Sequence, residues 1–139
     1  MKAAEEIDIL LIKNNPNNAE LTLRALRKTD IGAHLTIAQN GAEALKYLLS
    51  DRKLPRVVFL DLKLPKIDGM EVLRRIRADE RTHSIPVVVL TSSQEERDIT
   101  ECYRLGVNSY VVKPVEFDKF YKAVGELGLY WLVLNKSPL

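Results

Sequence analysis

The chain has 139 residues, which is the length of one domain and is enough to bury a hydrophobic core without disulfides or structural metal ions. Its net charge is +2, and basic and acidic residues are interleaved, so we expect no direct nucleic acid partner. Cys102 is the single cysteine, and no apolar run reaches the length of a membrane span. These features predict a cytoplasmic protein in a reducing compartment, with no membrane partner.

Strand-like and helix-like segments alternate five times along the chain. Short apolar and β-branched runs predict strands at residues 7–12, 34–38, 57–60, 86–91 and 109–112. Helical patterns lie between these runs and after the last one. Parallel strands need crossover connections, so this alternation predicts an α/β fold in which helices cover both faces of a parallel sheet.

Three of the predicted helices begin with the same signal. Asn17, Asn40 and Asp68 are each followed three residues later by a glutamate, which is the spacing of a capping box. The fourth helix lacks this spacing, and we expect Ser92 or Ser93 to cap its start.

Polar side chains stand at the ends of four predicted strands: Asn14, Asp61, Thr91 and Lys113. The carboxyl ends of parallel strands meet at one edge of the sheet, so we expect these side chains to converge. A carboxylate can act as a nucleophile, a hydroxyl can donate a hydrogen bond to an oxyanion, and an ammonium can neutralise it. The combination suits a phosphoryl group attached to Asp61, although Asp61 taken alone could equally cap a turn or a helix.

The segment Asp61-Leu-Lys-Leu-Pro-Lys-Ile-Asp-Gly-Met, followed in order by Thr91-Ser92, Tyr110 and Lys113-Pro114, resembles the receiver domain of two-component response regulators. The resemblance extends from residue 7 to about residue 127. It implies a flavodoxin-like (βα)5 doubly wound parallel sheet with strand order 2-1-3-4-5. It also implies a single receiver domain over residues 1–139 and a signalling protein that is not an enzyme.

The resemblance assigns a role to each of these residues. Asp61 would accept a phosphoryl group from a histidine kinase or phosphotransfer protein, and Lys113 and Thr91 would hold the acyl phosphate. Tyr110 would turn into the space that Thr91 leaves, and the altered surface would bind a downstream protein target. Mg²⁺ would be held by Asp61, the backbone carbonyl of Lys63 and an acidic pair after the first strand.

The chain departs from the family at that acidic pair, because Lys13 and Asn14 stand in its place. One carboxylate, the Asn14 amide and a carbonyl form a poor cage for Mg²⁺, so we expect only weak binding. Two interpretations follow. In the first, Asp61 still accepts phosphate and Lys13 supplies part of the neutralising charge. In the second, Lys13 and Lys113 both pair with Asp61, block metal entry and leave a pseudo-receiver that signals only by binding.

The last predicted helix is followed by an apolar extension, residues 128–139. Apolar residues recur at helical spacing and then occupy every side of the chain: Phe117, Phe120, Val124, Leu127, Leu129, Tyr130, Trp131, Leu132, Val133 and Leu134. The surplus predicts a homodimer through this helix and its extension, with folding back over the same domain as the alternative. The ending also resembles small single-domain regulators that partner bacterial phytochromes, which implies a phytochrome-type kinase.

Three rival functions fit the residues less well. A flavodoxin-like electron carrier needs a hydroxyl-rich or glycine-rich loop after the first strand, which residues 13–18 do not provide. A phosphatase of the haloacid dehalogenase type needs a second acid where Lys63 stands. A DNA-binding regulator needs an appended helical domain, for which the chain is expected to be too short.

Overall fold

The computed structural model describes residues 9–13, 20, 22, 24–25, 35–50, 53–113, 117–131 and 135–136, and the structural statements below concern these residues. Five parallel strands among them form one sheet in the order β2-β1-β3-β4-β5. The strands are β1 (Ile9–Ile12), β2 (Leu35–Ala38), β3 (Val57–Leu60), β4 (Val87–Thr91) and β5 (Ser109–Val112). The helices with described bounds are α2 (Gly41–Leu48), α3 (Gly69–Ala78), α4 (Glu96–Arg104) and α5 (Phe117–Leu129).

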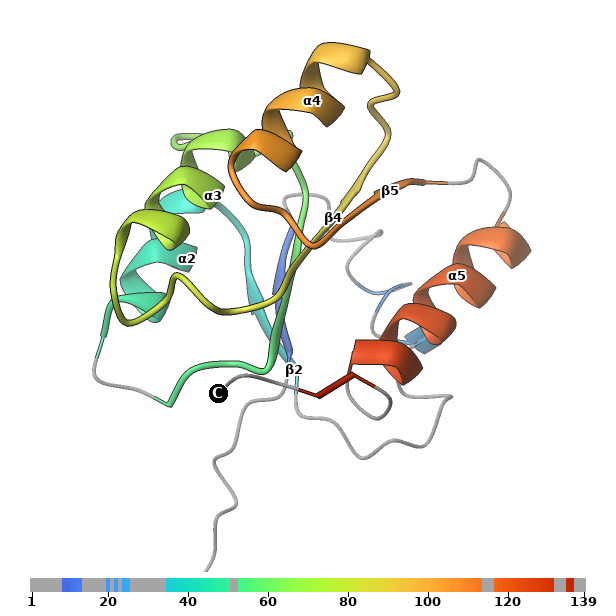
Figure 1. Ribbon diagram of the computed structural model, residues 1–139. Helices are drawn as coiled ribbons and strands as arrows, with labels where there is room; N and C mark the ends of the chain where they lie inside the picture. The colour runs from blue at the N-terminus through green and yellow to red at the C-terminus, as the bar shows by residue number, and fades with distance from the viewer. Residues whose placement is uncertain are drawn as a thin grey trace, which may run out of the picture.

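This is the predicted flavodoxin-like sheet in the predicted strand order. Helices α2 and α3 lie on one side of the sheet and α5 lies on the other (Figure 1). The start of the helix predicted from Asn17 falls outside the described residues. Across the described ranges, no helix combines the length and the apolar character that a membrane crossing requires.

The strand residues alternate between two hydrophobic clusters on opposite faces of the sheet. In β1, Leu10 and Ile12 belong to the cluster beneath α2 and α3, whereas Ile9 and Leu11 belong to the cluster beneath α5. All four are fully buried. Successive side chains of a strand point to opposite faces, so a strand covered on both sides must be apolar at every position. This is why the sequence shows unbroken apolar runs.

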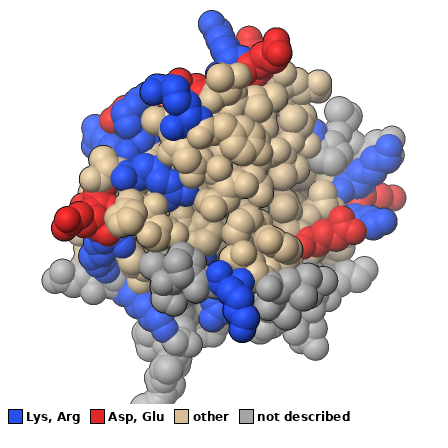
Figure 2. All heavy atoms as spheres, in the orientation of Figure 1, with Lys and Arg blue, Asp and Glu red and all other residues tan. Residues whose placement is uncertain are grey.

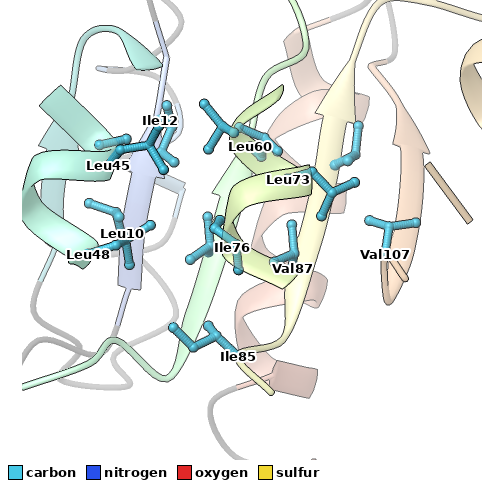
Figure 3. Packing of buried hydrophobic residues seen from close by; sticks show 14 of the residues in the cluster. Leu10, Ile12, Leu45, Leu48, Leu60, Leu73, Ile76, Ile85, Val87 and Val107 are labelled. Carbon is cyan, nitrogen blue, oxygen red and sulfur yellow. The ribbon is translucent and has the colours of Figure 1, made fainter. Parts of the chain in front are cut away.

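The α2–α3 side of the core is built from residues spaced three apart on each helix. Figure 3 shows Leu45 and Leu48 of α2 and Leu73 and Ile76 of α3 directed at the strands. This spacing places each pair on one face of its helix. Fully burying a side chain of this size contributes roughly 1.5–3 kcal/mol, so the apolar stripe anchors both helices.

At two of the three predicted capping boxes, the N-cap side chain makes the expected hydrogen bond. Asn40 Oδ1 accepts a hydrogen bond from the Glu43 N–H at 2.8 Å, and Glu43 Oε1 accepts one from the Gln39 N–H at 3.0 Å. At the start of α3, Asp68 Oδ1 accepts from the Glu71 N–H at 3.0 Å. These local bonds fix where α2 and α3 begin, and α3 begins directly after the loop that carries Asp61.

The predicted cap of α4 is wrong. The helix begins at Glu96 with Glu95 as its N-cap residue, and no side chain makes the capping hydrogen bond. The Ser93 hydroxyl instead donates to Asp98 Oδ2 at 2.5 Å and accepts from the Glu95 N–H at 3.3 Å. Ser93 therefore organises the loop before α4 without capping the helix.

The start of the apolar extension packs on its own domain. Trp131 is 8% exposed and belongs to the α5-side cluster with Phe120 and Val124. The preceding Tyr130 is 47% exposed and meets the Trp131 ring edge to face, with ring centroids 5.0 Å apart. Trp131 thus follows the fold-back alternative, whereas the side chains of residues 128, 129, 132–134 and 137–139 lie outside the description.

Arg77 of α3 joins the helix to the turn before β4 and to the loop before β5. Its guanidinium donates to the carbonyls of Gly106, His83 and Ile85 and to Asn108 Oδ1, at 2.8–3.0 Å. Burial lowers the pKa of this guanidinium from its ordinary value. One charged side chain therefore satisfies four acceptors that lie 6 to 31 residues away in sequence.

We expect Arg77→Met to lower the free energy of unfolding by about 2–4 kcal/mol, because four acceptors lose a charged donor while the aliphatic part of the side chain is kept. Urea denaturation measures the change. Arg75→Met is the matched control, since Arg75 is exposed and pairs with Glu71 on the helix surface, and it should leave stability almost unchanged. Equal losses in the two variants would contradict this account.

Candidate functional site

The polar residues that directly follow the strands lie at one edge of the sheet. Backbone hydrogen bonds extend the parallel ladder one residue past the strands, from the N–H groups of Lys13, Asp61 and Lys113 to the carbonyls of Ala38 (3.0 Å), Ile12 (3.0 Å) and Thr91 (2.7 Å). In a parallel sheet these strand ends face the same crevice. The position of each side chain in the site is therefore set by strand register.

The loop after β3 holds Asp61 tightly against the start of α3. The Gly69 N–H donates to the Leu62 carbonyl at 2.9 Å, and a Cβ atom at position 69 would lie 2.4 Å from the Asp61 carbonyl oxygen. Only glycine permits this approach. The Asp61 side chain is 12% exposed, and its Oδ1 accepts the Lys63 N–H at 3.2 Å. The carboxylate is thus fixed in place but still reachable.

Two ammonium groups face the other oxygen of this carboxylate. Lys113 Nζ lies 3.3 Å from Asp61 Oδ2, in an ion pair with hydrogen-bond geometry. Lys13 Nζ approaches the same oxygen from β1 at 3.8 Å, too far for a hydrogen bond. The Lys13 side chain is 1% exposed, and its Nζ has no hydrogen-bond partner within the described structure. The ion triad of Lys13, Asp61 and Lys113 therefore places two cations against one carboxylate.

This arrangement perturbs the protonation of Lys13. The pKa of Lys13 is lowered from 10.5 to about 7, chiefly because burial disfavours the charged form. Repulsion from Lys113 contributes to this lowering, and attraction to Asp61 opposes it. The Lys13 ammonium consequently gives up its proton more readily in the folded chain than in the unfolded chain.

The described residues do not fit a magnesium ion. The expected ligands were Asp61, the Lys63 carbonyl and Asn14, and Asn14 lies outside the described residues. The described ranges hold no cluster of three or more histidine, cysteine or acidic residues suited to a metal. A divalent ion at Asp61 Oδ2 would meet the Lys13 and Lys113 ammonium groups that already flank this oxygen. Magnesium prefers charged oxygen ligands, and the site offers positive charge instead.

Thr91 and Tyr110 are linked through the loop that follows β4. Thr91 is fully buried, and its Oγ1 accepts the Ser93 N–H at 3.3 Å. The half-buried Tyr110 hydroxyl donates to the Ser93 carbonyl at 3.0 Å, and burial raises the Tyr110 pKa. A displacement of this loop would therefore change the hydrogen bonds of both side chains. The switch role of Tyr110 stays a prediction.

Sequence reasoning missed that Ser93 is the connecting residue. It contacts Thr91, Tyr110, Glu95 and Asp98 through its backbone or its hydroxyl. A sequence signal existed, because Ser93 stands two residues after Thr91 and five before an acid. The same spacing also fits a helix cap, and sequence alone could not separate the two.

Comparison with known proteins identifies the family. The chain matches the response regulator receiver domain over residues 9–125. It therefore belongs to the response regulator receiver domain family of two-component signalling.

Individual relatives match along nearly the whole chain. The probable methanogenesis regulatory protein FilR2 of Methanothrix harundinacea is 41% identical over 142 residues, covering 99% of this chain and 92% of FilR2. The Mn²⁺-bound form of response regulator Rcp1 is 33% identical with a TM-score of 0.91, covering 96% of this chain and 99% of that chain. The phosphorylated cyanobacterial phytochrome response regulator RcpA is 32% identical with a TM-score of 0.91 and the same two coverages.

The Lys13 environment predicts a pH-dependent stability. Between pH 7 and pH 9 the unfolded chain keeps a proton on Lys13 that the folded chain loses, so the free energy of unfolding should rise with pH in this window. Above pH 9 the effect of Cys102, whose pKa burial raises from 9.0 to about 11, has the opposite sign. Urea denaturation from pH 6 to pH 9 should show the rise in wild type and in Lys46→Met, a control on the exposed surface of α2, and should show none in Lys13→Met. A rise that survives in Lys13→Met would assign it to another group.

Proposed function

We propose that this receiver domain accepts a phosphoryl group on Asp61 and signals by contact with a downstream protein. The observation that carries the proposal is the ion triad, in which a reachable carboxylate is flanked by ammonium groups at 3.3 Å and 3.8 Å from one oxygen. A carboxylate can attack phosphorus, and nearby cations stabilise the negative charge of the transferring oxygens.

In the proposed step, an Asp61 oxygen forms a bond to phosphorus while the bond from phosphorus to the donor breaks. Lys113 neutralises charge on the new acyl phosphate as a point charge. The Thr91 hydroxyl stands at the end of the adjacent strand and donates to a phosphoryl oxygen after leaving its interaction with Ser93. The chain's own side chains thus supply the nucleophile and the positive charge.

The hydrogen bonds of Ser93 support a structural link between the phosphorylation site and a protein-binding surface. Thr91 and Tyr110 are both hydrogen-bonded to Ser93. A Thr91 side chain that moves towards a phosphoryl group therefore alters the loop before α4 and the hydrogen bond that holds the Tyr110 hydroxyl. Between the charged groups over α4 and α5, Figure 2 shows a broad uncharged area, which suits contact with a protein. We assign the output to the surface of α4, β5 and α5.

The donor in this proposal is a histidine kinase of the phytochrome type. RcpA is a phytochrome response regulator, and it resembles this chain over nearly its full length. Divalent metal binding is known in the family from the Mn²⁺-bound form of Rcp1, but only weak Mg²⁺ binding is proposed for this chain because of Lys13.

A second function is favoured by the same lysine. If both ammonium groups stay paired with Asp61 and the contact is purely structural, the chain is a pseudo-receiver that binds its partners without being phosphorylated. The two functions differ in whether Asp61 ever acquires a phosphoryl group.

Acetyl phosphate separates them. We expect the wild-type chain, incubated with acetyl phosphate in a buffer containing Mg²⁺, to gain the mass of one phosphoryl group by intact mass spectrometry. Asp61→Asn should gain none, because it removes the nucleophile. Asp118→Asn, an exposed change on α5, should be labelled like wild type. An unlabelled wild type would establish the pseudo-receiver instead.

The proposal includes a homodimer through α5 and the extension. Trp131 is used by the domain itself, which leaves Tyr130, at 47% exposed, as the described aromatic of this region that is available to a second copy. A tyrosine suits an interface because its ring can be buried against a second copy while its hydroxyl keeps a hydrogen bond.

Light scattering on the full chain tests the dimer. We expect wild type to have twice the monomer mass and Tyr130→Glu to shift towards monomer, because a carboxylate would be buried without a partner. Tyr103→Glu is the control, since Tyr103 is 52% exposed on α4, outside the proposed interface. A monomeric wild type, or a Tyr130→Glu dimer of unchanged stability, would contradict the proposal.

A further inference from the structure

The Lys13 ammonium is buried without the partners that such a group requires. Its side chain is 1% exposed, it makes no hydrogen bond within the described structure, and the Asp61 oxygen 3.8 Å away already bonds to Lys113. Burying an ammonium is costly unless hydrogen bonds and an opposite charge compensate. Lys13 therefore has donors available for an oxygen atom that the described residues of the free protein do not supply.

The net positive charge of the ion triad favours the addition of an anion. With both lysines protonated, two positive charges face the single negative charge of Asp61. Phosphoryl transfer changes the group at this position from one negative charge to about two, as for other phosphorylated side chains. The triad would then be balanced, with each ammonium able to face an oxygen of the acyl phosphate.

The position of Lys13 in the chain points the same way. The family resemblance expects an acid here, which would share a divalent cation with Asp61. The structure instead brings a cation, carried on the end of β1, to Asp61 Oδ2. The backbone N–H of Lys13 is bonded to the Ala38 carbonyl at 3.0 Å, so the sheet itself fixes where the side chain starts.

We propose that the Lys13 ammonium replaces the divalent cation of this site, so that Asp61 accepts a phosphoryl group without metal. The inference rests on the proposed function and concerns its cation requirement. With acetyl phosphate, an Asp61 oxygen bonds to phosphorus, the bond from phosphorus to the acetate oxygen breaks, and acetate leaves with the electron pair. No proton is transferred and no further reactant is needed.

The first test compares labelling of the full chain by acetyl phosphate in EDTA and in Mg²⁺, followed by intact mass. Wild type should be labelled at the same rate in both buffers. In EDTA, Lys13→Met should be slower by about 100- to 1,000-fold, the loss expected when one preorganised hydrogen-bond donor is removed. The exposed Lys46→Met should keep the wild-type rate. Circular dichroism confirms that each variant is folded.

The second test is a measurement of binding that needs no phosphoryl transfer. A titration with Mn²⁺ alone, followed by electron paramagnetic resonance, should show that wild type binds Mn²⁺ only weakly. Lys13→Asp should bind Mn²⁺ much more tightly, because the substitution removes one cation and adds a second carboxylate. Wild type that binds Mn²⁺ as tightly as Lys13→Asp would overturn the inference.

The outcomes separate this inference from the proposed function. Labelling of wild type in Mg²⁺ but not in EDTA overturns the inference and leaves Asp61 as the acceptor. Absence of labelling in both buffers overturns the proposed function, and the Mn²⁺ titration then decides alone whether Lys13 holds the cation position.

Discussion

The candidate functional site depends on one crowded contact, in which the ammonium groups of Lys13 and Lys113 share a single oxygen of Asp61. None of these residues is near another in sequence, and each arrives at the end of a different strand. Only a parallel sheet in which β1 and β4 flank β3 brings them together. The contact is also unbalanced, because two cations repel each other across one carboxylate. The apolar strands beneath must hold it in place.

That support comes from burial on both faces of the sheet. Alternate residues of β1, β3 and β4 enter opposite clusters, so a shift of one residue in any strand would exchange its two faces and move its polar end. Leu60 pairs in register with Ile12 and with Val89, which fixes the starting points of Asp61 and Lys13 relative to each other. The core therefore does more than stabilise the domain, because it also sets the geometry of the charged site.

The sequence predicted those parts of the molecule that depend on local pattern. The strand order follows from the family resemblance, and the caps at Asn40 and Asp68 follow from side chains that bond three residues away. The start of α4 could not be predicted in this way, because Ser93 makes its main bond to Asp98 instead of capping the helix. The burial of Trp131 was not predictable either, since an apolar stretch looks the same whether its own domain or a partner covers it. The burial of the Lys13 side chain depends on the packing around β1, which the spacing of neighbouring residues in the sequence does not indicate.

The two sides of the site differ in how easily they move. On the β1 side, the Lys13 backbone is bonded to β2 and its side chain is enclosed, so a change there would disturb the sheet. On the β4 side, Thr91 meets the loop before α4 through one bond of 3.3 Å to Ser93, and Tyr110 of edge strand β5 holds the same residue. A phosphoryl group on Asp61 would have the rigidly held Lys13 ammonium on one side and, on the other, the loop before α4, which few hydrogen bonds hold. In the proposed phosphorylated state, the Lys13 side holds the anion in place and the structural response passes through Ser93 towards α4 and β5.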